Sequence, residues 1–269
     1  MFELSPHIEM SIRLFFFIAV LMVMGIWERL APKRQLLMPK KRRWLSNLLV
    51  VAIDTTVVRL VFPLAAVGVA LYAHANHIGL WNNIHWPYWL VVTVSVIILD
   101  MVIYWQHVLF HHAPLLWRVH RMHHVDLDVD VTTGVRFHPI EILISLLIKF
   151  ATILSFGMPA LSVLIFEVLL NAITLFNHSN IRMPFLLDKA IRSLIVTPDM
   201  HRVHHSTIPL ETNSNFGFNL SLWDRIFGTY RAQPRLGHDG MQLGISTIRE
   251  TRYCINLLGM LWLPFSKVK

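Results

Sequence analysis

The pattern of apolar and polar positions divides the chain into long hydrophobic runs separated by short polar connections. The first run covers residues 11–26, close to the roughly 20 residues that cross a 30 Å hydrocarbon core. A second run covers residues 44–75 and is interrupted by Asp54, Arg59 and Pro63. A third covers residues 88–112. We therefore predict three transmembrane helices within the first 112 residues.

Two further apolar runs, residues 140–157 and 159–177, predict a helical hairpin broken at Gly157, Met158 and Pro159. Its uncharged tip is compatible either with a pair that reaches the far side of the membrane or with a re-entrant pair. The more polar remainder is expected to pack under the membrane, with residues 255–265 as an interfacial helix. The expected fold is all-α and integral to the membrane, with about four transmembrane or membrane-embedded helices and a cytoplasmic helical cap.

No internal repeat or low-complexity linker interrupts the chain, so we expect a single membrane domain over residues 1–269. Residues 1–94 would supply the N-terminal transmembrane helices, and residues 95–231 form a histidine-rich region that carries the candidate catalytic site. Residues 232–269 would form a C-terminal cytoplasmic or interfacial segment.

Composition supports the membrane assignment and narrows the choice of partners. Hydrophobic residues make up 55% of the chain and charged residues only 15%. The net charge of +8 gathers in discrete loops rather than in a stripe with interleaved aromatics, which argues against nucleic acid as a partner. The single cysteine, Cys254, excludes an intramolecular disulfide and a thiolate metal cluster.

The distribution of positive charge predicts the topology. An excess of Lys and Arg in a short loop marks the cytoplasmic side, and residues 29–43 hold seven of them, whereas residues 74–87 hold none. The N-terminus is therefore expected outside and the histidine-rich region on the cytoplasmic face. The membrane would be the inner membrane of a bacterium, or the endoplasmic reticulum in a eukaryote.

Candidate chemistry lies in three histidine motifs. His107 to His111 forms H-x-x-x-H, and His120 to His124 and His201 to His205 each form H-x-x-H-H. Residues three and four apart share a helix face, about 5 to 6 Å between Cβ atoms, so such turns can grip an ion. An adjacent pair of histidines can divide between two neighbouring ions. Neutral imidazole suits iron, zinc, copper or nickel, so these motifs indicate a polynuclear metal site.

Two more histidines are candidate ligands. His178 ends a polar line of Glu167, Asn171 and Thr174 along the second hairpin helix, at the level of the other motifs. His138 lies just before the hairpin. The third motif has its own helix start, because Thr197 can cap the helix and Pro198 suits its first position. We leave out His7, His74, His77, His85, His112 and His238, which lack such spacing or lie on the outer side.

Ionisable residues inside apolar spans need partners. Lys149 and Glu167 lie equally far from the hairpin turn, and Arg59 and Asp100 lie at similar depth on the second and third spans. We predict both ion pairs. Asp100 has an alternative role, because it shares a helical stripe with His107 and could orient ligands.

Several motifs between Asp100 and Tyr230 together resemble the fatty acid hydroxylase and sterol desaturase superfamily of integral-membrane, non-haem di-iron enzymes. They are D-x3-Y-W-x-H-x3-H from Asp100, LWRVHRMHH from Leu116, RFHP from Arg136, NHSN from Asn177, PDMHRVHH from Pro198, and NSNFG followed by LSLWDRIFGTY. The resemblance implies that the ligands to two iron ions are His107, His111, His120, His123, His124, His138, His178, His201, His204 and His205.

The resemblance also implies the reaction, an O2-dependent hydroxylation or desaturation of a C–H bond in a membrane lipid such as a sterol-like, carotenoid or fatty acyl substrate. Nothing in the chain resembles a cytochrome b5 domain, so electrons would come from a separate ferredoxin- or cytochrome b5-like donor with its reductase. Residues proposed to support the ligands or orient the substrate are Asp100, Arg136, Asn180, Asn215 and Asp224.

Three alternatives stay open. The chain could be an acyl-lipid desaturase of the other histidine-box family, although the RFHP and WDRIFGTY pieces favour the sterol type. It could be a membrane zinc protein or zinc hydrolase, because imidazole alone does not select iron and zinc can substitute. It could also be a metal transporter, which would be expected to place its ligands near the bilayer midplane.

Overall fold

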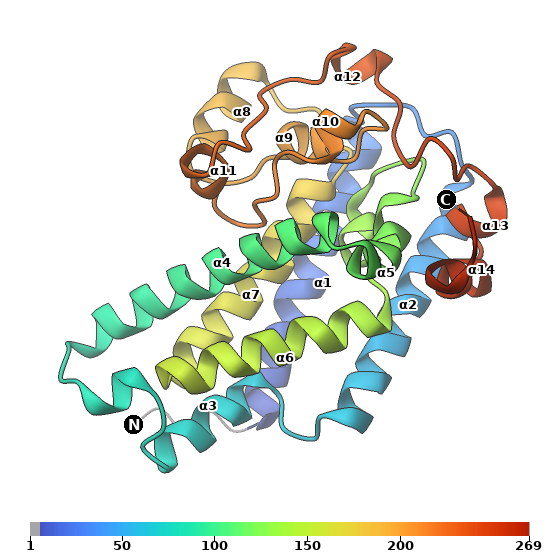
Figure 1. The fold of residues 1–269 in the computed structure, drawn as a ribbon. Coiled ribbons are helices and arrows are strands. Elements are labelled where there is room, and N and C mark those ends of the chain that lie inside the picture. The colour runs from blue at the N-terminus through green and yellow to red at the C-terminus, as the bar shows by residue number, and fades with distance from the viewer. Residues whose placement is uncertain (1–5, 269) are drawn as a thin grey trace.

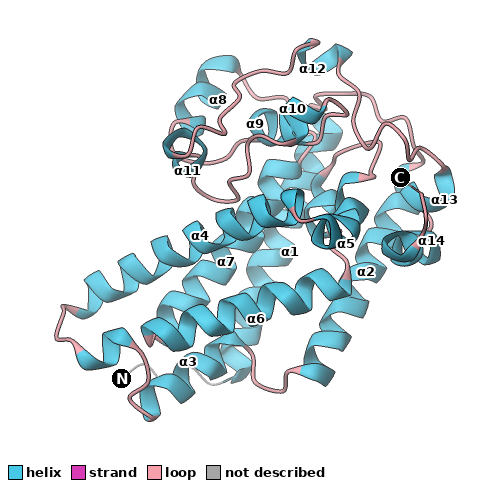
Figure 2. Cartoon of the chain, viewed as in Figure 1, coloured by secondary structure: helices cyan, strands magenta, loops and turns pink. Residues whose placement is uncertain are grey.

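The computed structural model describes residues 6–268, and every regular element within them is a helix (Figure 2). The α-helices are α1 Pro6–Leu30, α2 Lys40–Val61, α3 Ala66–Ala75, α4 Tyr88–His112, α5 Pro114–His124, α6 Pro139–Phe156, α7 Ala160–His178, α8 Phe185–Arg192, α9 Pro198–His204, α10 Pro209–Thr212, α11 Leu222–Ile226, α12 Gly237–Gly240, α13 Thr251–Cys254 and α14 Leu257–Trp262. Three short 3-10 helices are η1 Leu80–Asn83, η2 Val131–Val135 and η3 Leu263–Phe265.

Five helical segments among the described residues are long and apolar enough to cross a membrane, which agrees with the predicted all-α membrane fold. They are His7–Leu30, Lys40–Asn83, Tyr88–His112, Pro139–Phe156 and Ala160–His178. The short helices α8 to α14 gather at one end of the long ones, where α4 and α7 finish and α2 begins (Figure 1). We call α5 and α8 to α14, with their connecting loops, the cap.

The second hydrophobic run is two helices rather than one. Helix α2 ends at Val61 and α3 begins at Ala66. Pro63 lies in the break, where its missing backbone N–H and fixed φ do not suit a helix interior. The hairpin between α6 and α7 turns at Gly157, as predicted, with a φ of 65°. A Cβ on Gly157 would lie 2.5 Å from the carbonyl oxygen of Ile78, so this close contact requires glycine.

The predicted ion pair in the hairpin is confirmed. The Nζ atom of Lys149 lies 2.5 Å from Oε1 of Glu167, and both side chains are buried. Arg13 of α1 also contacts this carboxylate. Two cations therefore share one buried anion, which ties the hairpin to α1 and offsets the cost of burying the three charges.

The second predicted pair, Arg59 with Asp100, is wrong. Asp100 accepts hydrogen bonds from Nε1 of Trp223 at 2.8 Å and from the backbone N–H of Leu220 at 3.2 Å. The guanidinium of Arg59 instead contacts the sulfur of Met10 at 3.4 Å. The reason is helix adjacency: α2 packs on α6 and η2, whereas α4 packs on α5, α6 and α7. Equal depth does not make two helices neighbours.

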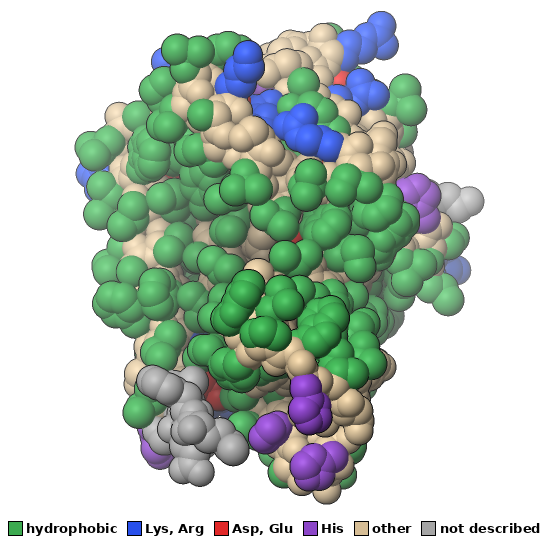
Figure 3. Space-filling model, turned by 90° about the vertical axis from the view of Figure 1, so that its left-hand side faces the viewer, with side chains coloured by type: hydrophobic (Ala, Val, Ile, Leu, Met, Phe, Trp, Pro, Cys, Tyr) green, Lys and Arg blue, Asp and Glu red, His purple; other side chains and the backbone are tan. Residues whose placement is uncertain are grey.

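The surface carries the marks of a membrane interface. On the face shown in Figure 3, apolar side chains cover most of the middle, and Lys and Arg side chains gather mainly at the cap end. Within the predicted interfacial segment, α14 and η3 expose Leu258, Trp262 and Phe265 while burying Met260 and Leu263. This amphipathic arrangement suits a helix lying at the level of the lipid headgroups.

Candidate metal centre

Nine of the ten histidines proposed as ligands converge where α4, α5, α7 and α9 meet. They form two groups, and within each group the ligand atoms lie within 4.8 Å of one another. The first group contains His107, His111, His120, His124 and His204; the second contains His123, His178, His201 and His205.

Helical spacing explains the division. His107 with His111, and His120 with His124, are pairs four residues apart on α4 and α5, and each pair belongs to the first group. The side chain of His123 points into the second group, although it is the immediate neighbour of His124. Adjacent residues on a helix point about 100° apart, so one turn can serve two centres.

The same logic applies to the end of α9. His204 joins the first group, whereas His201 and His205, four residues apart, join the second. The predicted cap starts this helix: the Thr197 hydroxyl accepts a hydrogen bond from the backbone N–H of Met200, and Pro198 is in the first turn. Capping aligns the first turn of α9 with the site.

Hydrogen bonds from Nδ1 orient several of the rings. The Nδ1 atom of His107 lies 2.7 Å from the carbonyl oxygen of Phe216, and that of His204 lies 2.8 Å from the carbonyl oxygen of Ser214. The ring of His120 makes the same kind of contact with Oε1 of Glu141, at 2.7 Å. An Nδ1–H donated in this way leaves a lone pair on Nε2, the atom that would bind a metal.

Those Nε2 atoms are buried and have no partner among the described residues. This is true of His107, His111, His120 and His204. In the second group, Nε2 of His178 faces Nε2 of His123 at 3.1 Å and Nε2 of His201 at 3.0 Å. Buried polar atoms are normally paired, and a cation between converging lone pairs would satisfy them. The donor set therefore fits metal ions.

The protonation state of the histidine rings also suits metal binding. Burial lowers the pKa of His123, His124, His201 and His205 well below the usual value, and neighbouring imidazoles lower it further. Burial likewise lowers the pKa of His204 to about 3. These rings are therefore neutral at pH 7, which is the form that binds a metal.

The structure does not bring His138 into either group. It caps the start of α6, where its Nδ1 accepts from the backbone N–H of Ile140 at 3.1 Å. Its Nε2 lies 3.1 Å from the carbonyl oxygen of Leu261. Both ring nitrogens are thus used in structural contacts. The histidines left out at the start, His7, His74, His77, His85, His112 and His238, are also absent from both groups.

The proposed supporting residues hold the backbone that carries the ligands rather than the rings themselves. Asp224 accepts from the backbone N–H groups of Phe216, at 2.7 Å, and Gly217, at 2.9 Å. Because the carbonyl of Phe216 orients His107, Asp224 acts on that ring through one peptide unit. Burial raises the pKa of Asp224 to about 6.

The other four residues tie separate segments together. Asp100 holds α11 against α4 through Trp223. Asn215, at a positive φ of 53°, donates to the carbonyls of Met200 and Arg231 at 2.9 and 2.8 Å. Asn180 donates to the carbonyl of Arg34 at 2.7 Å, and Arg136 donates to those of Met122 and Cys254 at 2.9 and 2.6 Å.

Sequence reasoning missed two residues that contact the rings. Glu141 lies in the first turn of α6 and holds His120, and the Asn213 side-chain oxygen lies 3.3 Å from Nδ1 of His111. The only signal for Glu141 in the sequence was an acidic residue three positions after His138, and nothing local to it indicates a contact with His120.

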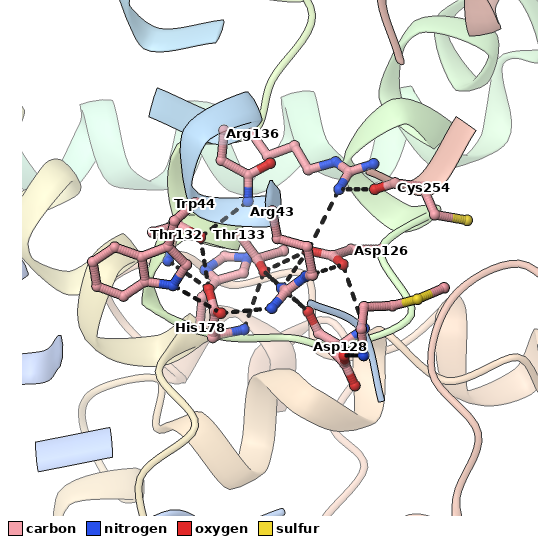
Figure 4. Close-up of polar contacts among 12 residues, drawn as sticks. Arg43, Trp44, Asp126, Asp128, Thr132, Thr133, Arg136, His178 and Cys254 are labelled. Carbon is pink, nitrogen blue, oxygen red and sulfur yellow. Dashed lines mark hydrogen bonds and ion pairs between the residues drawn. The ribbon is translucent and has the colours of Figure 1, made fainter. Parts of the chain in front are cut away.

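A second cluster was also missed, in the loop that follows α5 (Figure 4). The guanidinium of buried Arg43 bonds both oxygens of Asp126, at 3.0 and 2.8 Å, and one oxygen of Asp130 at 2.6 Å. We call these three residues the arginine network. It positions η2 so closely against α7 that a Cβ on Gly134 would lie 3.3 Å from Nδ1 of His178.

The fold and the site define a class: a membrane-embedded helical protein with two buried histidine groups, each suited to hold a metal ion, at one end of its helices. The chain belongs to the fatty acid hydroxylase family, whose model matches residues 92–229. This range includes all nine converging histidines. No solved structure matches the chain.

Curated relatives carry names of lipid-oxidising enzymes. Ornithine lipid hydroxylase OlsE of Rhizobium tropici is 32% identical over 174 residues, which are 65% of this chain and 51% of that protein. Alkylglycerol monooxygenase of Xenopus tropicalis is 27% identical over 203 residues, 71% of this chain and 43% of that protein. Lathosterol oxidase of Mus musculus is 28% identical over 147 residues, 53% of this chain and 47% of that protein. The chain thus spans about half the length of these relatives.

Proposed function

We propose that this protein is a membrane-bound, non-haem di-iron oxidoreductase that uses O2 to hydroxylate or desaturate a C–H bond of a membrane lipid. The observation that carries the proposal is the pair of buried imidazole groups, whose unpartnered Nε2 atoms converge at one end of the apolar helices. Membership of the fatty acid hydroxylase family supports iron over zinc as the resident metal.

The ligand assignment follows the two groups. One iron ion would be held by His107, His111, His120, His124 and His204, and the other by His123, His178, His201 and His205. His138 is proposed as a helix cap rather than a ligand. Two iron ions bound there would supply the O2 activation that oxidation of an unactivated C–H bond requires.

The protein's own part is to fix the rings and to keep the site dry. Glu141 and the carbonyls of Phe216, Ser214 and Thr174 hold Nδ1 atoms, so that each Nε2 atom points inward. The ring of Phe137 stacks on His123 with centroids 4.5 Å apart, and that of Phe218 lies 4.8 Å from His107. Apolar walls of this kind exclude water from a reactive centre.

We propose lipid substrates of the kinds named for the relatives: an ornithine lipid, an alkylglycerol or a sterol. Electrons would come from a separate ferredoxin- or cytochrome b5-like donor with its reductase. The positive charge at the cap end supports a cytoplasmic site with the N-terminus outside, in the inner membrane of a bacterium or the endoplasmic reticulum of a eukaryote.

The test is to purify the protein in detergent without added zinc and to measure bound metal, O2 uptake and lipid products together. We expect about two iron ions per chain and O2 uptake that depends on iron, a reductant and lipid. Bound zinc without O2 uptake would support the zinc protein or hydrolase instead. Metal flux into vesicles without lipid oxidation would support a transporter.

A further inference from the structure

A cavity of about 280 Å³ opens directly beside the first histidine group. Three segments line it: His111 and Trp117 at the junction of α4 and α5, five residues of the segment after α9, and residues 244–246. The five are Ser206, Thr207, Pro209, Thr212 and Asn213. His111 is the one ring of the nine that lines it, and it is also the least buried of them. The cavity is therefore an approach from outside to the first group.

The polar groups of the lining are uncharged and stand among apolar side chains. Ser206, Thr207, Thr212, Asn213 and Ser246 contribute hydroxyl and amide groups, and none of the lining residues is Asp, Glu, Lys or Arg. The hydroxyls of Thr207 and Ser246 and the amide NH2 of Asn213 have no hydrogen-bond partner among residues 6–268. These groups can bond a ligand's hydroxyl or ether oxygen, but nothing here would neutralise a phosphate or an ammonium group.

Two exposed leucines lie close in sequence to the residues that line the cavity. Leu115 lies two residues before Trp117 and is 78% exposed, and Leu210 follows Pro209 and is 74% exposed. Pockets that enclose a whole small molecule usually measure roughly 300 to 1,000 Å³, so this one takes only part of a lipid. A polar group would enter while its hydrocarbon chain lies along the leucines.

Residues 244–246, which form the third side of the cavity, lie beyond the part of the chain that the family model matches, residues 92–229. They are fixed to the site all the same. The backbone N–H of Gly244 donates to the carbonyl of His205 at 3.1 Å, and that of Thr207 donates to the carbonyl of Gln242 at 3.0 Å. These backbone bonds hold the loop in place, so the exposed side chain of Ser246 can vary without moving the histidines.

We infer that this cavity is the head-group site for a neutral, hydroxyl-bearing lipid, and that Thr207 and Ser246 determine its specificity. The inference rests on the proposed function and narrows it. Because His111 of the first histidine group lines the cavity, the carbons that adjoin the head group lie nearest that group, so oxidation takes place there rather than far along the chain. Among the candidate substrates, it favours an alkylglycerol or a sterol over a zwitterionic ornithine lipid.

The experiment compares iron-loaded wild type with Thr207→Val, Ser246→Ala and the matched control Thr247→Val, an exposed threonine that does not line the cavity. The probes are 1-O-hexadecylglycerol, the hexadecyl propyl ether that lacks its hydroxyls, and an ornithine lipid. Iron content and O2 uptake are measured for every variant. Product positions are assigned by mass spectrometry.

We expect wild type to prefer the alkylglycerol over both other probes and to oxidise it beside the head group. Thr207→Val and Ser246→Ala should each raise KM for the alkylglycerol about three- to tenfold, the cost of one neutral hydrogen bond, and leave the deoxy ether unchanged. Thr247→Val should match wild type. Preference for the ornithine lipid, mid-chain oxidation, or equal KM in all variants would overturn the inference while iron and O2 uptake persist. Absence of iron and O2 uptake in wild type would instead overturn the proposed function.

Discussion

The arginine network and the histidine groups are both buried at the cap end, but they differ in hydrogen bonding. The charged atoms of the network are paired, whereas several ring nitrogens of the histidine groups are not. Around Arg43, the carboxylates of Asp126 and Asp130 meet guanidinium nitrogens at 2.6 to 3.0 Å. Among the described residues, the Nε2 atoms of His107 and His204 have no partner. An unsatisfied buried polar group costs about 1 to 3 kcal/mol of folding free energy, so a cluster of such groups indicates a site where a bound ligand offsets that cost. Polar atoms with protein partners therefore mark the region that stabilises the fold, and those without partners mark the region that is available to bind a ligand.

The two regions also differ in the charge of their buried side chains. Burial alone would raise the pKa of Asp126, but Arg43 and Arg136 lower it below its usual value, so this carboxylate stays ionised. His123 and His201 lack such a counter-charge among the described residues, and burial keeps their rings neutral. One region is a closed set of ion pairs, and the other is a set of neutral donors open to a cation.

The largest effect is expected from removing one imidazole. His123→Ala should abolish activity and reduce bound iron, because it takes one of four donors from the second group. His238→Ala, a histidine outside both groups, should leave iron and activity near wild type. Metal analysis and O2 uptake on the two purified variants provide the comparison. Equal tolerance at both positions would falsify the ligand assignment.

The second largest effect is expected from removing the buried cation of the arginine network. Arg43→Met should lower the free energy of unfolding by about 3 to 5 kcal/mol, because it leaves Asp126 and Asp130 buried without their cation. Arg43→Lys keeps the charge but loses the two-pronged contact and should cost less. Thermal unfolding in detergent measures both. Iron per folded molecule should stay near wild type, and loss of iron without loss of stability would contradict a purely structural network.

A smaller effect is expected at the contact between the ring of His120 and its carboxylate. Glu141→Gln should weaken iron binding about 10- to 100-fold, because a neutral amide holds the Nδ1–H of His120 less strongly than a carboxylate does. Iron titration of the metal-free protein measures this. The control is Glu211→Gln, since Glu211 is buried but bonds the backbone of Arg235 instead of a ring. Equal affinities in the two variants would remove the proposed role of Glu141.

The smallest effect concerns pH. Burial raises the folded-state pKa of Asp224 to about 6, above its unfolded value of 3.8, so its ionisation destabilises the fold as pH rises through 6. Between pH 5 and 7.5 this should cost the metal-free protein about 1 kcal/mol of unfolding free energy. Asp224→Asn should lack that dependence, so the stability advantage of wild type should shrink as pH rises. An advantage that grows instead would contradict the raised pKa.

Sequence pattern predicted the long helices well because membrane spans depend on local composition. The third run coincides with α4, and the hairpin turns at Gly157 as expected. Pairings between helices were harder. Lys149 and Glu167 are covalently linked through one tight turn, so counting from the turn was enough. Arg59 and Asp100 lie on helices whose packing partners no local pattern reveals.

The histidine motifs behaved similarly. Those with helical spacing carry their own geometry and converge as groups. His138 was predicted from its position and from the family resemblance, without such spacing, and the structure places it as the cap of α6. Glu141 and the network around Asp126 were not predicted, because their partners His120 and Arg43 lie 21 and 83 residues away. Contacts of that kind depend on how the helices pack.

The neighbouring residues His123 and His124 face different centres, as do His204 and His205. The gap between the two histidine groups, and between the metal ions proposed to occupy them, is therefore spanned twice by a single peptide bond, the stiffest link in a polypeptide. New side chains at positions 245 and 246 would therefore change the head-group cavity without changing the distance between the two groups. Such a chain could change which lipid it accepts while its metal-to-metal spacing stays the same.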